Sequence, residues 1–523
     1  MFGQCCFVLL CLLFSKNVSW GFNVDTDFPI VVNGIPGSDF GFTVAFYRDR
    51  TGKSHALVGA IRANSSLQQW RTIYQPGALF QCPLLENGRQ CSEVVVERAG
   101  NRDTPSADEA SRYHDLKDNM TLGMTLESTP GGRTVVCGPL WKNQKWYGVH
   151  LANGVCYVLD RDLKPQKKLL PLVKRTLQVV SYDYYYYAAE SGFSATFTQR
   201  GDLILGAPGF LNWKGTFVRY RPSLDRYVPA SSIGRSQGSY IGYSVTSGRF
   251  FRNEDVVIAT GAPRGNTYKG EVYLVSSVTV SLRGKLLGSQ MGEYFGATLL
   301  AIDLDKDGLE DLLVGAPQFS QPSGVDEGRV YVYISTGTSL YPAATLEGGQ
   351  AQGSRFGTSI ANIGDINMDG IDDIAIGAPY ENDVGAVYIY HGARYQGART
   401  AFAQRILASD IAAKTGSPIK GFGISIAPGH DADANHYNDI LVGAYQSDSA
   451  VLLRTRPLIR TNASIDADIT MISPEIGSCE VAEGQTLSCF NLKLCLSYTG
   501  RFAKNEIGKS SITIRYEGMK INA

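Results

Sequence analysis

Three nine-residue segments in the second half of the chain carry carboxylate or amide side chains at positions 1, 3, 5 and 9. Position 7 would add a main-chain carbonyl. The candidate ligands are Asp303, Asp305, Asp307, Leu309 and Asp311; Asp365, Asn367, Asp369, Ile371 and Asp373; and Asp431, Asp433, Asn435, Tyr437 and Asp439. Oxygen donors at this spacing wrap around one hard cation, and Ca²⁺ tolerates the flexible geometry of a peptide loop better than Mg²⁺ does. The sequence therefore predicts three structural Ca²⁺ sites.

The same spacing occurs in EF-hand loops, which also need Glu at position 12 and flanking helices. Position 12 is Val314, Ile376 or Val442 here, each inside an apolar run typical of a buried strand. EF-hands are therefore excluded. A single acidic turn could be merely solvated, whereas three at matching positions of successive repeats favour metal binding. The corresponding stretch 247–257, SGRFFRNEDVV, lacks the spacing, and we expect no ion there.

The acidic segments lie within repeats of short strands. A small residue followed by alternating apolar or aromatic residues recurs seven times, with a period of about 62 residues. The copies begin at Gly77, Gly154, Gly215, Gly270, Gly328, Gly385 and Ser449. Before each copy, an apolar residue beside Gly opens one strand, and Gly-Ala or Gly-Pro closes the next. Seven units of three or four strands predict an all-β fold, a seven-bladed β-propeller; an open solenoid is the alternative.

The two ends of the chain differ from the repeats. Residues 1–21 contain an apolar run too short to span a bilayer, which predicts a signal peptide, with a buried strand as the alternative. Residues 22–456 hold the repeats, and 457–523 alternate without them, which predicts the first strands of a separate β-sandwich. Because the chain stops within strand-like sequence, we expect a truncated domain, with any membrane anchor beyond Ala523.

Cysteines and glycosylation sequons fit an oxidising compartment. Close spacing predicts the disulfides Cys82–Cys91, Cys137–Cys156 and Cys479–Cys489. Cys495 is left over, as a free thiol, an intermolecular partner, or one half of a pair whose other half lies outside this chain; the last is favoured. Sequons lie at Asn64, Asn119 and Asn462.

Composition excludes several functional classes. Lys and Arg number 49 and Asp and Glu number 49, so the formal net charge is zero, which argues against a nucleic-acid-binding protein. The six histidines form no cluster in sequence, and no P-loop or H-E-x-x-H motif occurs. Gly234–Gly238 formally matches G-x-S-x-G, but strand-like sequence follows where that motif needs a helix. We therefore expect no enzymatic activity.

The repeats, the acidic loops, the mature start FNVDTD and the SCFNLKLC cysteine spacing resemble integrin alpha subunits that lack an inserted I domain. The resemblance runs from Phe22 to about Tyr516. It implies a propeller on an Ig-like thigh domain, an obligate heterodimer with a beta subunit, and the extracellular portion of a single-pass type I membrane glycoprotein at the cell surface. Three acidic loops, and GAPGFLNWKG at 206–215, are most similar to laminin-binding or invertebrate position-specific members.

The resemblance also implies a role for aromatic residues beside the repeat glycines. In the family such residues ring the upper centre of the propeller and cage a basic side chain of the beta subunit, for which cation–π attraction is the physical reason. The candidates are Phe42, Phe193, Tyr243, Tyr294 and Phe422. The alternative is core packing. The run Tyr182–Tyr187 is either a ligand-contact patch or a packed edge strand.

Together these observations predict a cell-adhesion receptor subunit. Its propeller would bind a beta subunit and an extracellular-matrix ligand, possibly laminin-like, while Ca²⁺ rigidifies blades 5 to 7. The alternative is a secreted calcium-dependent propeller protein, either a hydrolase or a glycan-binding module.

Overall fold

A computed structural model describes residues 23–502 apart from 86–89, 104–113, 130, 147–148, 173–187, 231–232, 235, 254–255, 350, 395–396, 468–478, 482–484 and 488–491. The predicted signal peptide, the tyrosine run and Cys489 lie outside the described residues. So do two residues of the stretch 247–257.

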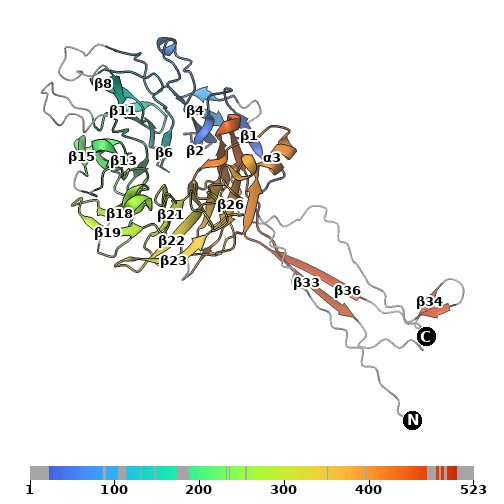
Figure 1. The fold of residues 1–523 in the computed structure, drawn as a ribbon. Coiled ribbons are helices and arrows are strands. Elements are labelled where there is room, and N and C mark those ends of the chain that lie inside the picture. The colour runs from blue at the N-terminus through green and yellow to red at the C-terminus, as the bar shows by residue number, and fades with distance from the viewer. Residues whose placement is uncertain are drawn as a thin grey trace. The chain divides into compact units, whose positions relative to one another are not determined.

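Seven four-stranded antiparallel sheets follow one another around a ring, so the predicted seven-bladed propeller is confirmed (Figure 1). Blade 1 comprises β2 (Phe40–Arg48), β3 (Ser54–Ala60), β4 (Ala78–Pro83) and β5 (Ser92–Glu93). Blade 2 comprises β6 (Thr125–Ser128), β7 (Thr134–Gly138), β10 (Val155–Leu159) and β11 (Pro165–Leu169). Blade 3 comprises β12 (Ala195–Phe197), β13 (Leu203–Ala207), β14 (Thr216–Arg221) and β15 (Arg226–Pro229).

The remaining four blades repeat the pattern. Blade 4 comprises β16 (Val245–Gly248), β17 (Val257–Ala262), β18 (Glu271–Ser276) and β19 (Leu282–Leu287). Blade 5 comprises β20 (Thr298–Ile302), β21 (Asp311–Ala316), β22 (Arg329–Ser335) and β23 (Leu340–Leu346). Blade 6 comprises β24 (Ser359–Gly364), β25 (Asp373–Ala378), β26 (Ala386–Tyr390) and β29 (Gln404–Leu407). Blade 7 contains β30 (Phe422–Ile426), β31 (Ile440–Ala444) and β32 (Ser449–Leu453).

The N-terminal strand completes the last blade. β1 (Ile30–Asn33) pairs antiparallel with β32, with Ile30 opposite Leu452 and Asn33 opposite Ser449. In Figure 1 strand β1 therefore lies beside the last repeat. Sequence repeats did not reveal this strand, because it belongs to no Gly-aromatic unit. The two ends of the ring are thus joined by main-chain hydrogen bonds.

A ring of hydroxyl groups links each blade to the next. In every blade, the second residue after the repeat glycine is Ser or Thr, and its hydroxyl donates to a main-chain carbonyl of the following blade. The donors are Thr43, Thr125, Ser194, Ser244, Thr298, Ser359 and Ser425, and the acceptors are Gly123, Phe193, Gly242, Gly296, Thr358, Gly423 and Gly41. The seventh bond, from Ser425 to Gly41, closes the circle at 3.5 Å.

The repeat glycine allows two blades to approach at this point. Gly242 has a φ of 90°, and a Cβ there would clash with the carbonyl oxygen of Thr216. Only glycine combines this backbone conformation with so close a neighbour. In six of the seven blades the residue directly before the glycine is apolar and buried between neighbouring sheets, as Phe295 and Phe356 show at 0% exposure.

Two disulfides and a few short elements complete the propeller. Cys82–Cys91 and Cys137–Cys156 are both formed, and Cys495 is exposed and unpaired among the described cysteines. The helices are α1 (Phe210–Trp213), α2 (Gly265–Tyr268) and α3 (Ala408–Thr415), and the minor strand pairs are β8 (Lys142–Trp146) with β9 (Val149–Ala152) and β27 (Gly392–Ala393) with β28 (Gly397–Ala398). Within the described part of the chain, no helix is both long and apolar enough to cross a membrane.

The chain divides into two compact units at Thr455 and Arg456, with Ala434–Tyr437 grouped with the second. In the second unit, β33 (Arg460–Ala467) pairs with β36 (Leu492–Thr499), and β34 (Cys479–Val481) pairs with β35 (Gln485–Leu487).

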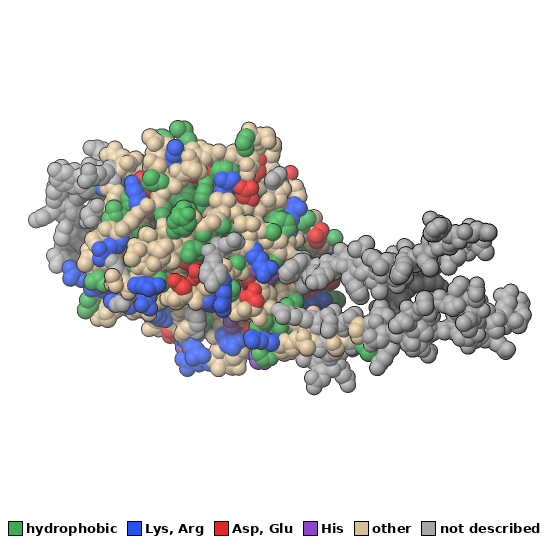
Figure 2. All heavy atoms as spheres, turned by 90° about the horizontal axis from the view of Figure 1, so that it is seen from below, with side chains coloured by type: hydrophobic (Ala, Val, Ile, Leu, Met, Phe, Trp, Pro, Cys, Tyr) green, Lys and Arg blue, Asp and Glu red, His purple; other side chains and the backbone are tan. Residues whose placement is uncertain are grey.

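On the propeller face drawn in Figure 2, acidic and basic side chains are interspersed, as the zero net charge suggests.

Candidate functional site: acidic loops and an aromatic rim

Each acidic segment is the loop that joins the first and second strands of a blade. The loop after β20 leads into β21, and its counterparts join β24 to β25 and β30 to β31. In the first loop, Asp303 accepts main-chain hydrogen bonds from Asp307 (3.2 Å) and Gly308 (3.0 Å), which hold the turn closed. The side chains of Leu309 and Ile371 are buried and fix the position-7 carbonyls of their loops.

The aspartate at position 9 is the buried member of each set. Asp311, Asp373 and Asp439 are all 0% exposed. Asp311 accepts main-chain hydrogen bonds from Leu304 (2.9 Å) and Ser335 (2.8 Å), and thereby ties the loop to β22. Burial raises the pKa of Asp311 to about 7, and burial likewise raises that of Asp439 to about 7. A carboxylate buried among other carboxylates is stabilised by a bound cation.

The donor set fits a hard cation in two of the loops. Carboxylate oxygens of Asp303, Asp305 and Asp311 lie within 4.8 Å of one another, and so do those of Asp431, Asp433 and Asp439. These donors are all oxygens, as Ca²⁺ requires.

In the second loop a histidine side chain lies beside the predicted ligands. The Nδ1 atom of His391 lies 3.1 Å from Asp373 Oδ1 and 2.9 Å from Asn367 Nδ2. An imidazole thus contacts two of the predicted ligands. Sequence reasoning missed His391, which lies 18 residues after Asp373 and directly follows β26.

Aromatic side chains form a rim at the opposite end of the first strands. Tyr294 precedes β20 whereas Asp303 follows it, so about 17 Å of strand separates the rim from the acidic loop. The Tyr243 ring lies 4.8 Å from Phe193 and 5.5 Å from Tyr294, measured between centroids. All three side chains are partly exposed. Burial raises the pKa of Tyr294 to about 12, so its hydroxyl stays neutral.

Comparison with known proteins finds relatives that share these repeats. The FG-GAP repeat matches residues 295–333 and 356–390. The chain is 32% identical to integrin alpha-5 of Xenopus laevis over 96% of its own length and 49% of that protein. It is 35% identical to integrin alpha-4 of Xenopus laevis (92% and 46%) and 30% identical to integrin alpha-8 of Homo sapiens (96% and 48%). This chain is an integrin alpha homologue. It spans about half the length of these relatives.

The integrin alpha homologue contains no domain-sized insertion between blades 2 and 3. β11 ends at Leu169 and β12 begins at Ala195. The expectation of a member without an inserted I domain agrees with this spacing.

The aromatic rim of the homologue extends beyond the residues predicted from sequence. Phe42 lies 5.7 Å from the ring of Tyr445, whose hydroxyl is 3.3 Å from that of Tyr380. Tyr380 and Tyr445 follow the Gly-Ala steps that end the second strands, and those strands return to the same face. The repeated position could have revealed them.

Two arginines of the homologue itself lie against this rim. Arg264 lies 4.8 Å above the Tyr240 ring and donates to its hydroxyl at 2.8 Å, and Arg355 lies 5.4 Å above the Tyr380 ring. Cation–π contacts therefore already occur on this face within the chain.

Phe422 does not lie with the rim. It is 0% exposed and packs in the core between blades 6 and 7. The reason is its place in the repeat: Phe422 is the buried aromatic directly before the glycine, as Phe295 and Phe356 are, whereas the rim residues precede or follow that pair. Phe422 therefore packs in the core, which was the alternative interpretation of these aromatic residues.

Two predicted glycosylation sites are accessible. Asn64 and Asn119 are exposed, and Asn119 has a φ of 51° in a turn. Asn462 lies on β33, and its side chain is outside the described residues.

Proposed function

We propose that this chain is the propeller-bearing part of a cell-adhesion receptor subunit that pairs with an integrin beta subunit. The aromatic rim carries this proposal, because Phe42, Phe193, Tyr243 and Tyr294 present partly exposed rings on one face of a chain homologous to integrin alpha subunits. Aromatic faces of this kind bind a basic side chain of a partner by cation–π attraction. The matrix ligand would bind the same face.

We propose a structural role for Ca²⁺ in the three loops. The predicted ligands would hold the ion between the first and second strands of blades 5, 6 and 7, where it would neutralise the buried aspartates. Because loops and rim lie at opposite ends of the first strands, the ions would act on the rim by rigidifying those blades. Catalysis is not part of the proposal.

The setting of the proposal is the cell surface. Residues 1–21 would direct the chain into the secretory pathway, residues 457–523 would begin a thigh sandwich, and the whole would be the extracellular portion of a single-pass type I membrane glycoprotein. Cys479–Cys489 and glycans at Asn64, Asn119 and Asn462 belong to this proposal. A laminin-like matrix protein is the ligand class suggested by sequence.

Co-purification tests the pairing. The full reading frame is co-expressed with a beta subunit on cells, affinity-purified in Ca²⁺, and quantified for the partner. The Tyr243→Ala/Tyr294→Ala double variant should retain less than one tenth of the wild-type partner. Tyr341→Ala is the matched control, because this tyrosine is 64% exposed on the outer strand β23, and it should retain the full amount.

Thermal unfolding of each purified variant shows that the propeller is intact. Recovery of the full reading frame from cells in Ca²⁺, folded but without the co-expressed beta subunit, would contradict the receptor proposal and favour a secreted propeller protein. Equal partner recovery from the double variant and the control would remove the rim from the interface.

A further inference from the structure

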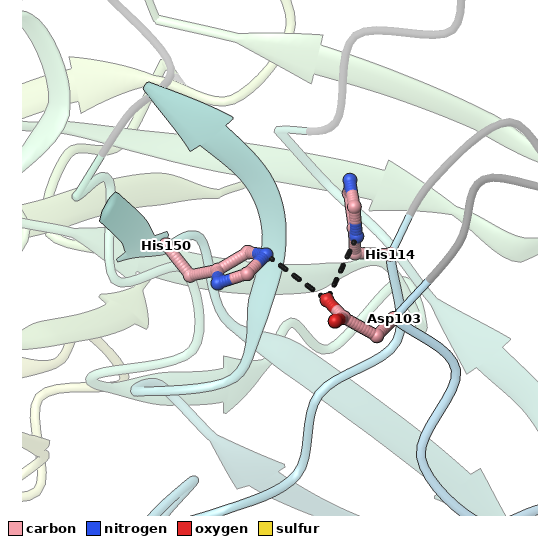
Figure 3. Close-up of side chains that lie close together, drawn as sticks. All are labelled: Asp103, His114 and His150. Atoms are coloured by element: carbon pink, nitrogen blue, oxygen red, sulfur yellow. Dashed lines mark ion pairs between the residues drawn. The ribbon is translucent and has the colours of Figure 1, made fainter. Parts of the chain in front are cut away.

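The connection between blades 1 and 2 brings together two histidines that lie far apart in sequence. Arg102 pairs with Asp115, Leu116 pairs with Lys142, and β8 pairs with β9. Asp103 and His114 therefore lie on neighbouring segments, and His150 lies on β9 nearby (Figure 3). None of the three belongs to the acidic loops or to the aromatic rim.

The three side chains converge on one point. Asp103 Oδ1 lies 3.5 Å from His114 Nδ1 and 3.5 Å from His150 Nε2. The two imidazole rings are 5.0 Å apart, and the three potential ligand atoms lie within 4.8 Å of one another. Figure 3 shows both rings directed toward the carboxylate.

These separations suit metal ligands better than hydrogen bonds. A nitrogen–oxygen distance of 3.5 Å exceeds the usual range of about 2.7–3.2 Å. In a tetrahedral Zn²⁺ site with bonds of about 2.0–2.1 Å, neighbouring ligand atoms lie about 3.3 Å apart. Moreover, His114 Nδ1 is buried and has no hydrogen-bond partner among the described residues.

The exposure of the three side chains is that of a preformed site that an ion can enter from solvent. The side chains of His114 and His150 are only 16% and 19% exposed, whereas Asp103 is 74% exposed. The imidazoles are thus held by packing, while the carboxylate borders solvent. Two imidazoles and one carboxylate select Zn²⁺ over Ca²⁺, which takes oxygen donors.

We propose that Asp103, His114 and His150 form a Zn²⁺ site with a fourth position open to water. The ion would join Asp103 and His114 to β9 and so stabilise the connection between blades 1 and 2. This inference is independent of the proposed receptor function, because no residue is shared with the rim or the loops.

Metal analysis of the affinity-purified full chain tests the site. The protein is equilibrated with zinc chloride in millimolar Ca²⁺, so that the acidic loops hold their preferred ion, and bound zinc is measured after gel filtration. Wild type should bind one Zn²⁺, and Co²⁺ in its place should give the visible absorption of a tetrahedral site. Asp103→Asn and His150→Gln should lower bound zinc at least tenfold.

His55→Gln is the matched control. His55 also faces a carboxylate, with its Nε2 atom 3.1 Å from Asp49 Oδ2, but that pair lacks a second imidazole. The control should keep one Zn²⁺, and zinc should raise the Tm of wild type and control only. Zinc binding that is absent from folded wild type, or equal in wild type and Asp103→Asn, would overturn the proposal.

Discussion

The aspartate at position 9 of each acidic loop has two roles. Asp311 caps main-chain N–H groups of its own loop and of β22, and it also faces Asp303 and Asp305. Hydrogen bonds favour its charged form, while burial and the neighbouring carboxylates oppose it. A cation bound in the loop would supply the counter-charge that stabilises the carboxylate.

Asp311→Asn tests this balance, because it keeps the shape of the side chain and removes its charge. We expect bound Ca²⁺ to fall from three ions to two, and the Tm in Ca²⁺ to fall toward the Tm in chelator. Glu310→Gln is the control, because Glu310 accepts from Gln199 and the Arg249 main chain and lies outside the ligand pattern. Three ions in Asp311→Asn would contradict the assignment of this loop.

A cluster of buried ion pairs joins two elements of the propeller. Lys168 on β11 contacts Glu97 (2.9 Å) and Asp115 (3.0 Å), and the fully buried Lys117 contacts Asp115 at 2.8 Å. The cluster ties the connection after blade 1 to the outer strand of blade 2. Burial opposes ionisation of Asp115, but Lys168 and Lys117 outweigh it and hold the pKa of Asp115 below its ordinary value.

Removing Lys168 leaves Asp115 and Glu97 with Lys117 as the one cation of the cluster, so one buried negative charge is no longer compensated. Lys168→Met should therefore lower the free energy of unfolding by about 3–5 kcal/mol at neutral pH. Lys167→Met, at the preceding residue of β11, removes only an exposed pair with Asp225 and should cost less than about 1 kcal/mol.

The difference in unfolding free energy between Lys168→Met and Lys167→Met should depend on pH, because the pKa of Asp115 is lowered in the folded state. Its stabilising contribution is complete above the ordinary carboxyl pKa and is lost as the pH falls through the lower, folded-state value. Urea unfolding of both variants at neutral and acidic pH measures this. Equal destabilisation by the two substitutions would contradict the inferred role of the cluster.

Strand elements were predictable where their residues repeat. All seven predicted third strands, the acidic loops and the Gly-aromatic openings occupy equivalent places in successive sheets. β1 was not predictable in this way, since IVVN is short and pairs with a strand at the far end of the propeller sequence. The positions of Phe422, Arg264 and His391 were also missed, because burial, ring stacking and contact across a blade depend on side-chain packing that no spacing encodes.

Closure of the ring is a property of the whole molecule. β1 supplies main-chain hydrogen bonds to β32, and Val32 is only 2% exposed in the core between blades 7 and 1. Val32→Asp places a charge in that core, so we expect a loss of at least about 3 kcal/mol of stability and a marked fall in secretion. Phe28→Asp, at a side chain that is 63% exposed, should leave secretion and Tm unchanged.

Secreted yield and Tm of both variants measure the contribution of this closure. Normal secretion and an unchanged Tm for Val32→Asp would show that the last blade is stable without β1.

The pairing of β1 with β32 also sets an order of events during biosynthesis. Ile30 leaves the ribosome about 420 residues before its partner Leu452, which at about 5–20 residues per second is a wait of roughly 20–85 s. Blades 1 to 6 can form while translation continues, but the seventh cannot be completed until nearly the whole propeller has been synthesised. For that interval β1 lacks its partner strand β32, and it is the segment that a chaperone would have to shield.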